Sequence, residues 1–163
     1  MSITDELLRN NEAYVANFTP SGLTARPARA LAIVACMDAR LDLFQALGLD
    51  VGDAHLIRNA GGVVTDDTIR SLAISQRLLG TEEVMLIHHS DCGLEVTTDD
   101  EFRNAILEDT GIKPPWAVEA FSDVDSDVRQ SIARVEASPF LPRTDRVRGF
   151  VYEVESGRLR EVT

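Results

Sequence analysis

The amino-acid sequence predicts an α/β fold, in which a single domain holds a central, mostly parallel β-sheet flanked by helices, with an antiparallel edge strand and an N-terminal helical arm. Uninterrupted apolar runs of strand length alternate with segments of helical periodicity, a pattern typical of parallel strands that are buried on both faces. The last two strand-like runs flank Ser156 and Gly157, which indicates a hairpin and therefore an antiparallel pair. The length of 163 residues suits one domain that spans residues 1–163.

The central and C-terminal parts of the chain supply the strands and helices of this fold. Five apolar runs predict strands, at residues 31–35, 54–57, 84–88, 150–154 and 159–162. Four segments predict helices, at residues 42–47, 67–79, 99–109 and 123–137. Gly48 and Gly80 end the first two helices, because glycine favours the backbone conformation that follows a helix. Pro114 and Pro115 separate the last two.

The N-terminal segment predicts one further helix, at residues 5–18, with Thr4 as the candidate N-cap. Its apolar side chains recur at helical spacing: Leu7, Leu8, Tyr14, Val15 and Phe18. Residues 19–29 contain two prolines and a glycine and are expected to form a loop. Two interpretations fit this stripe equally, since the helix either lies on the body of its own subunit or, with the loop, forms an arm of residues 1–29 that grips a second subunit.

The charge balance excludes two classes of partner. The chain carries 16 basic and 27 acidic side chains, for a formal net charge of −11. Such a surface repels nucleic acid phosphates and anionic lipid headgroups, so we expect neither nucleic acid nor membrane partners. The N-terminus lacks the regions of a secretory signal, and no apolar run approaches the ~20 residues of a membrane span. We therefore expect a cytoplasmic protein whose two cysteines are reduced thiols.

Candidate functional residues follow directly on three predicted strands. The polar ones are Cys36, Asp38 and Arg40 after the first strand, Arg58 and Asn59 after the second, and His88, His89, Asp91 and Cys92 after the third. Gly61 and Gly62 also follow the second strand, and Gly93 follows the third. In open α/β sheets, ligands bind in the crevice outside the carboxyl ends of the strands. The three groups are therefore expected to converge on one site.

A zinc site is the chemistry that these residue types favour, because thiolate and neutral imidazole are preferred donors for Zn²⁺. His89 and Cys92 are three residues apart in a turn, and Cys36 supplies a third donor from another strand. His88 and His89 cannot both face inward in a continuing strand, so we take His89 as the candidate ligand. Three protein ligands with a fourth position open to water or to a carboxylate are typical of a catalytic zinc site.

Each of these residues also has a plain structural interpretation. A lone buried cysteine such as Cys36 is usually a small hydrophobic residue, and His55 is taken as structural. Arg40 beside Asp38 also fits an exposed ion pair worth less than about 1 kcal/mol. The two glycines fit an ordinary turn. Their coincidence at three strand ends favours a shared site.

At these residues the sequence resembles the β-class carbonic anhydrases, and most of all their short mycobacterial members. The resemblance rests on Cys36-x-Asp38-x-Arg40, on His89-x-x-Cys92 followed by Gly93, and on the Arg-Asn-Ala-Gly segment that begins at Arg58. It covers residues 31–93 closely and the later elements more loosely. One departure is Pro27, where many plant-type members have a glutamine that contacts substrate across the dimer interface.

The resemblance implies reversible hydration of carbon dioxide to bicarbonate and a proton by a zinc-bound hydroxide, in a homodimer or tetramer. It implies Zn²⁺ held by Cys36, His89 and Cys92. It also implies a catalytic pair, Asp38 and Arg40, in which Asp38 is a possible fourth zinc ligand in a closed state. The implied substrate pocket lies at Ala60, Gly61 and Gly93. Asp38 is expected to orient the hydroxide, and Arg40 to hold Asp38 away from the metal.

Four alternatives remain beside this interpretation. Some relatives of the family hydrolyse carbonyl sulfide or carbon disulfide on the same kind of zinc site. A non-catalytic zinc-binding protein of the same fold has no need of Asp38 and Arg40 beside the ligands. A thiol redox protein is disfavoured because the chain has no Cys-x-x-Cys pair. A nucleotide-binding protein is disfavoured because neither phosphate-binding glycine motif occurs.

Overall fold

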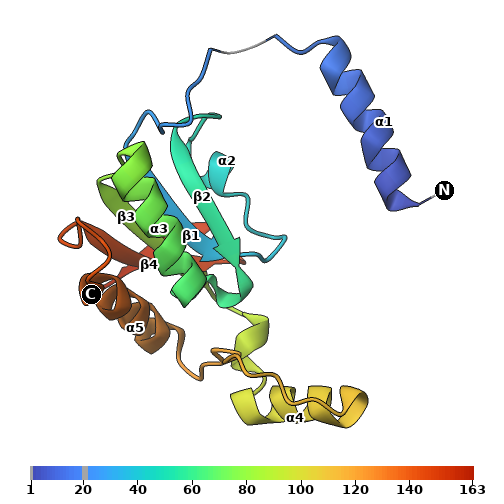
Figure 1. The fold of residues 1–163 in the computed structure, drawn as a ribbon, viewed down its shortest axis with the longest axis vertical. Helices are drawn as coiled ribbons and strands as arrows, with labels where there is room; N and C mark the ends of the chain where they lie inside the picture. Colours follow the sequence, from blue (N-terminus) through green and yellow to red (C-terminus); the bar gives the residue numbers. More distant parts are fainter. Residues whose placement is uncertain (1, 20–21) are drawn as a thin grey trace.

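One five-stranded sheet forms the centre of the molecule (Figure 1). The computed structural model describes residues 2–19 and 22–163. In the order in which they lie across the sheet, the strands are β2 (Ala54–Asn59), β1 (Leu31–Cys36), β3 (Glu83–His89), β4 (Val147–Glu153) and β5 (Arg158–Val162). The first three pairings are parallel, and β5 runs antiparallel to β4 at the edge. The predicted α/β fold, with a mostly parallel sheet and an antiparallel edge strand, is confirmed.

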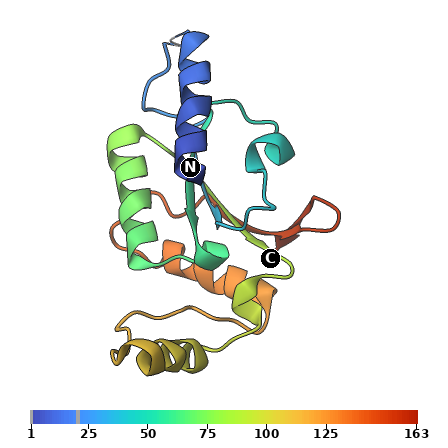
Figure 2. The ribbon, with the colours of Figure 1, turned by 90° about the vertical axis from the view of Figure 1, so that its right-hand side faces the viewer.

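Helices cover both faces of this sheet. The helices are α1 (Ile3–Ala16), α2 (Leu43–Leu47), α3 (Asp66–Leu79), α4 (Asp99–Thr110) and α5 (Val124–Glu136), with short 3₁₀ turns η1 (Ala60–Gly62) and η2 (Gly93–Glu95). Successive residues of β1 face opposite ways. Ala32 and Val34 pack against α3 and α5, whereas Ile33 and Ala35 pack against the side that carries α2. Figure 2 shows α2 and α3 on opposite sides of the strands.

Side-chain caps explain where several helices begin. Asp42 caps α2 and Thr65 caps α3, each accepting a hydrogen bond from a main-chain N–H in the first turn. Gly48 and Gly80 end these helices in the left-handed conformation, as predicted. The predicted N-cap Thr4 is wrong. Ser2 caps α1 instead, because its hydroxyl pairs with the Asp5 N–H while the Asp5 carboxylate accepts from the Ser2 N–H.

Three strands are longer than their apolar runs by two residues, and β1 and β5 are each longer by one. β2 continues to Asn59 and β3 to His89, while β4 begins at Val147 rather than at residue 150. Main-chain pairing continues through the polar residues, since Arg58 pairs with Ala35 and Asn59 with Cys36. Cys36, Arg58, Asn59 and His89 therefore lie on the last pairs of the sheet.

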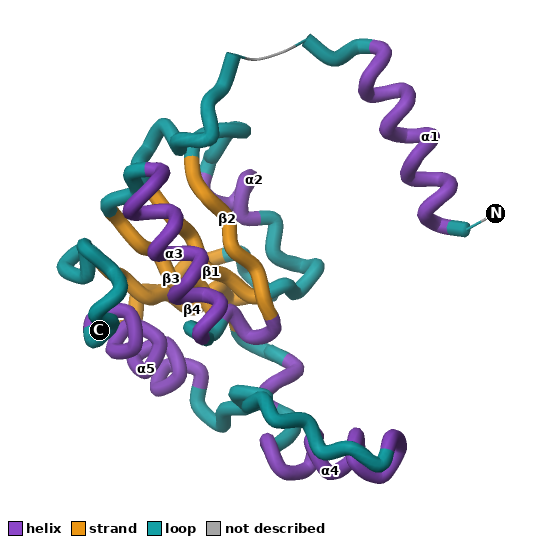
Figure 3. The backbone as a smooth tube through the Cα atoms, in the orientation of Figure 1, coloured by secondary structure: helices purple, strands orange, loops and turns teal. Residues whose placement is uncertain are grey.

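The N-terminal helix α1 stands away from the body of the subunit (Figures 1 and 3). None of the side chains of this fully described helix is buried, and Leu7 and Leu8 are each 59% exposed. The interpretation in which this helix lies on its own subunit is therefore wrong. Of the predicted loop, residues 20 and 21 lie outside the described residues. Among the described helices, none is long and apolar enough to cross a membrane.

The remainder of the loop is fastened to the body. The side chain of Leu23 lies against Gly52, and His55 Nε2 lies 2.9 Å from the carbonyl oxygen of Ala25. A carbonyl only accepts, so Nε2 donates and Nδ1 accepts from the Ser75 hydroxyl at 2.7 Å. His55 thus has the structural role expected of it.

Candidate metal centre

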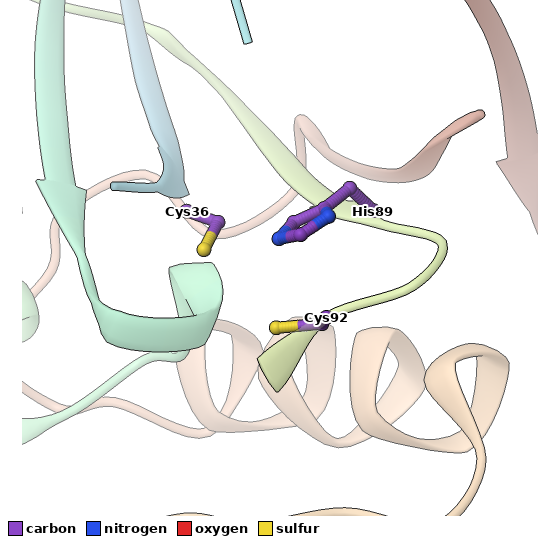
Figure 4. A group of neighbouring side chains, drawn as sticks. All are labelled: Cys36, His89 and Cys92. Atoms are coloured by element: carbon purple, nitrogen blue, oxygen red, sulfur yellow. The ribbon is translucent and has the colours of Figure 1, made fainter. Parts of the chain in front are cut away.

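The carboxyl ends of two neighbouring parallel strands bring three metal-binding side chains together (Figure 4). Cys36 is the last residue of β1, His89 is the last residue of β3, and Cys92 follows in the next turn. Their ligand atoms all lie within 4.8 Å of one another. Each of the three residues is at most 4% exposed. The structure thus assembles the three candidate ligands in a buried cluster that can hold one metal ion.

The His89 ring is oriented so that one nitrogen faces this cluster. Nδ1 lies 2.9 Å from the carbonyl oxygen of Ser90 and donates to it. Nε2 therefore carries the lone pair, and it is buried without a hydrogen-bond partner among the described residues. An unpartnered buried nitrogen is costly, and a metal ion supplies the missing partner. Two sulfur donors and this imidazole fit Zn²⁺.

His88 points to the opposite face of β3. Its ring is fully buried, and Nδ1 lies 2.9 Å from Oδ2 of Asp127 on α5. The alternation of side chains along a strand accounts for this separation. His88 therefore belongs to the packing between β3 and α5, and only His89 faces the two cysteines.

The three donors influence one another's protonation. The hydrogen bond from the Cys92 thiol lowers the pKa of Cys36, and the same bond together with burial raises the pKa of Cys92. Burial lowers the pKa of His89, but the neighbouring Cys36 sulfur outweighs burial and leaves a net rise. The cluster therefore favours one thiolate before any metal arrives, and binding of a metal displaces the remaining protons.

Asp38 and Arg40 form a pair in the loop that follows β1. Arg40 donates from Nε and Nη2 to the two carboxylate oxygens of Asp38, at 3.0 and 2.8 Å, and its main-chain N–H donates to Oδ1 at 2.9 Å. These hydrogen bonds hold the pKa of Asp38 well below its usual range. Asp38 Oδ2 lies 3.8 Å from His89 Nε2. An ionised carboxylate therefore stands beside the metal ligands and is held there by a guanidinium.

Asp91 is a partner of Arg40 to which the sequence analysis assigned no role. Arg40 Nη1 donates to Asp91 Oδ2 at 2.7 Å, and Nη2 donates to the Asp91 carbonyl at 2.9 Å. Asp91 lies between His89 and Cys92 and has a φ of 56°, a conformation that aspartate tolerates better than most residues. Arg40 thus joins the loops that follow β1 and β3, next to the candidate metal ligands. The sequence feature that could have predicted a role for Asp91 is its position between two candidate ligands, His89 and Cys92.

The predicted pocket residues lie in the two 3₁₀ turns beside the cluster. Ala60 and Gly61 are in η1 and Gly93 opens η2, and a Cβ added to Gly61 would meet Leu94 of η2 at 2.7 Å. A Cβ added to Gly62 would lie 2.7 Å from the main-chain nitrogen of Cys36. The glycine pair is therefore needed for close approach and is more than an ordinary turn.

A cavity of about 680 Å³ opens beside the pair. Its lining residues are Arg40, Ser90, Asp91, Glu153, Val154 and Glu155. Arg40 lines this cavity and also contacts Asp38. The pair therefore lies between the buried metal ligands and a surface cavity lined by three acidic residues, Asp91, Glu153 and Glu155.

Comparison with known proteins identifies the family. A family model described as carbonic anhydrase matches residues 31–108. Beta-carbonic anhydrase 1 of Mycobacterium tuberculosis is 54% identical to the chain over 163 residues, which cover 100% of this chain and 99% of that protein. The chain belongs to the β-class carbonic anhydrase family. The resemblance inferred from the motifs, including the likeness to mycobacterial members, is thereby confirmed.

Two further proteins are similar to this chain. The crystal structure of a carbonic anhydrase from Streptococcus mutans matches with a TM-score of 0.93 and 43% identity, covering 100% of this chain and 99% of that one. A carbon disulfide hydrolase of Acidithiobacillus thiooxidans is 36% identical over 153 residues, covering 81% of this chain and 76% of that protein. The β-carbonic anhydrase fold thus carries more than one named activity among its relatives.

Proposed function

We propose that the chain is a zinc enzyme that catalyses the reversible hydration of carbon dioxide to bicarbonate and a proton. One observation carries the proposal: an ionised carboxylate, Asp38, is held by Arg40 beside the three metal donors. A purely structural zinc site needs neither of these residues. The membership of the β-carbonic anhydrase family supports the same reaction.

In this mechanism Cys36, His89 and Cys92 would hold the zinc. When bound, zinc supplies a nucleophile from water near neutral pH. The hydrogen bond from His89 Nδ1 to the Ser90 carbonyl fixes the ring and its tautomer. Asp38 accepts a hydrogen bond from the attacking group and orients it toward carbon dioxide. Arg40 keeps Asp38 ionised and limits its rotation, because it binds both carboxylate oxygens.

Hydrolysis of carbon disulfide or carbonyl sulfide is the second candidate function. The observation in its favour is the 36% identity to a carbon disulfide hydrolase. All three substrates are small linear molecules, and the same zinc donors and the same Asp38 serve each of them. The discriminating experiment offers each substrate separately, in solution, to the zinc-loaded enzyme. Turnover that is fastest with carbon dioxide supports the first proposal, faster turnover of a sulfur compound supports the second, and zinc without any turnover indicates a non-catalytic protein.

We also propose a homodimer in which α1 packs on a second copy of the chain, with residues 1–29 as the arm of one domain that spans residues 1–163. The support is the apolar stripe of α1, which its own subunit leaves exposed. Light scattering of the intact chain and of a Leu7→Ser, Leu8→Ser double variant tests this. We expect a dimer that the double variant weakens, while Val51→Ser, a control at a residue 79% exposed, leaves it intact. A monomeric wild type would refute the proposal.

A cytoplasmic location completes the proposal. Cys36 and Cys92 are free thiols, and reduced thiols persist in a reducing compartment. Cell fractionation with an antibody against the chain tests the location. Recovery in the periplasmic or secreted fraction would contradict it.

A further inference from the structure

Arg58 reaches from β2 to the loop that carries Asp38 and Arg40. It is the residue before the last of β2 and pairs with Ala35 of β1. Its guanidinium donates to three main-chain carbonyls of that loop: Nε to Cys36 at 2.9 Å, Nη2 to Asp38 at 2.6 Å and Nη1 to Leu41 at 3.2 Å. One side chain thus contacts the start, the middle and the end of residues 36–41.

Apart from Arg58, the middle of this loop is anchored through Arg40, whose main-chain N–H donates to Asp38 and whose side chain binds Asp91. Cys36 and Leu41 are buried at its two ends. Between them, Met37 is 65% exposed, and Ala39 and Arg40 are also exposed. The main-chain hydrogen bonds of the loop are those from Met37 to Asn59 and from Leu41 to Asp38. The Asp38 carbonyl accepts from the Leu41 N–H as well as from Arg58 Nη2. The three contacts of Arg58 therefore add a side-chain anchor to the main chain at the start, middle and end of the loop.

Asp38 is consequently held at both ends by two different arginines. Arg40 binds its carboxylate, and Arg58 binds its carbonyl. The planar guanidinium of Arg58 carries five donors in a fixed geometry, which allows one side chain to bridge three acceptors. A lysine ammonium is a compact group that cannot span the same three carbonyls.

We propose that Arg58 is a positioning residue, which sets the place of the Asp38 carboxylate by fixing the main chain of residues 36–41. The inference rests on the proposed function, because Asp38 is the group whose position matters for the reaction. Arg58 contacts carbonyls of the loop and acts on catalysis only through Asp38. A displacement of about 1 Å of a catalytic group costs on the order of 100-fold in rate.

Arg58→Lys is the main test, with kinetics and amide exchange measured on zinc-loaded protein. We expect kcat for carbon dioxide hydration to fall by about 10- to 100-fold, with KM and zinc content unchanged because the binding of a small gas does not use Arg58. We also expect Arg58→Ala to recover part of its kcat when guanidinium is added at millimolar concentration. Arg70→Lys is the matched control, since Arg70 makes an exposed ion pair with Asp67 away from the site, and its kcat should equal that of the wild type.

Amide hydrogen exchange supplies a readout that does not depend on turnover. In Arg58→Lys the amides of residues 37–41 should exchange faster, while those of residues 84–87 in β3 keep their wild-type rates. Unchanged exchange and unchanged kcat would overturn the proposal, and so would a uniform acceleration across the sheet, which would make Arg58 a general stability residue. If Arg58→Lys does not fold, Arg58→Gln, which keeps one amide donor, is measured in the same way with the same criteria.

The proposed function and the role of Arg58 can be overturned separately. Absence of carbon dioxide turnover in the wild type overturns the proposed function. Normal turnover in the wild type, together with normal kcat and normal loop exchange in Arg58→Lys, overturns the role of Arg58 alone.

Discussion

Arg40 binds both carboxylate oxygens of Asp38, with Nε 3.0 Å from Oδ1 and Nη2 2.8 Å from Oδ2. The same carboxylate lies 3.8 Å from His89 Nε2. A carboxylate is itself a zinc ligand, so a freed Asp38 would be close enough to compete for the fourth position on the metal. We therefore propose that the ion pair keeps the site open and that loss of the pair would favour the closed state.

Replacement of Arg40 tests this relationship. In Arg40→Ala we expect kcat/KM to fall by about 100-fold or more, because Asp38 loses its orientation and gains access to the metal. Bound zinc should stay at the wild-type level, since Cys36, His89 and Cys92 are untouched. Stopped-flow hydration and metal analysis on the same sample measure both quantities. Arg70→Ala, at an exposed ion pair elsewhere, is the matched control, and unchanged activity in Arg40→Ala would refute the switch.

Replacement of Asp91 should have a much smaller effect. Asp91→Asn keeps the carbonyl that accepts from Arg40 and tolerates the φ of 56°, so only the carboxylate charge is lost. The carboxylate is 78% exposed, and an exposed ion pair is worth less than about 1 kcal/mol. We expect kcat to fall less than about fivefold, the rate equivalent of that energy. A loss as large as that of Arg40→Ala would show that Asp91 has a greater role than anchoring.

The lowered pKa of Asp38 limits which group can set the pH dependence of activity. Arg40 lowers the pKa of Asp38, so the carboxylate is ionised throughout the neutral range, and its stabilising contribution is present above its unfolded pKa of about 3.9. That contribution is lost only as the pH falls through the lowered folded value. Asp38 therefore adds no change in activity near neutral pH. Activity should rise with pH through neutrality and favour mildly alkaline conditions, because the metal centre titrates there. A pH profile of kcat/KM with its inflection near pH 4 would contradict this assignment.

Much of the fold follows from the sequence, because uninterrupted apolar runs that alternate with helical segments are typical of buried parallel strands. The ends of β2 and β3 do not follow, since polar residues such as Arg58 and His89 continue the main-chain pairing. The place of α1 also does not follow from the sequence, because one apolar stripe fits packing on either subunit.

The candidate ligands were predictable for a physical reason. Cys36 and His89 end strands that lie side by side and parallel, so their side chains meet at one edge. The contacts of Arg58 were not predictable, because its acceptors are main-chain carbonyls, which every residue has whatever its side chain. The same holds for the carbonyl of Asp91 that accepts from Arg40.

The glycine at position 62 gives a prediction about stability. Gly62 has a φ of 74°, and an added Cβ would lie 2.7 Å from the Cys36 nitrogen and 2.9 Å from the Ile87 oxygen. Gly62→Ala should therefore lower the free energy of unfolding by at least about 2 kcal/mol through backbone strain and overpacking. Gly93→Ala is the matched comparison, because nothing lies within 4 Å of the added Cβ, and it should change stability by less than about 0.5 kcal/mol. Equal urea unfolding curves for the two variants would refute the close approach.

Stopped-flow hydration of carbon dioxide at about pH 8.5, above the roughly neutral pKa of zinc-bound water, tests the central claim most directly, with zinc determined on the same sample. We predict fast turnover and about one zinc per chain, as expected for three protein ligands around one ion. Zinc at that level without turnover would contradict the catalytic role of Asp38 and Arg40. Protein that binds no zinc at all would contradict the metal centre itself.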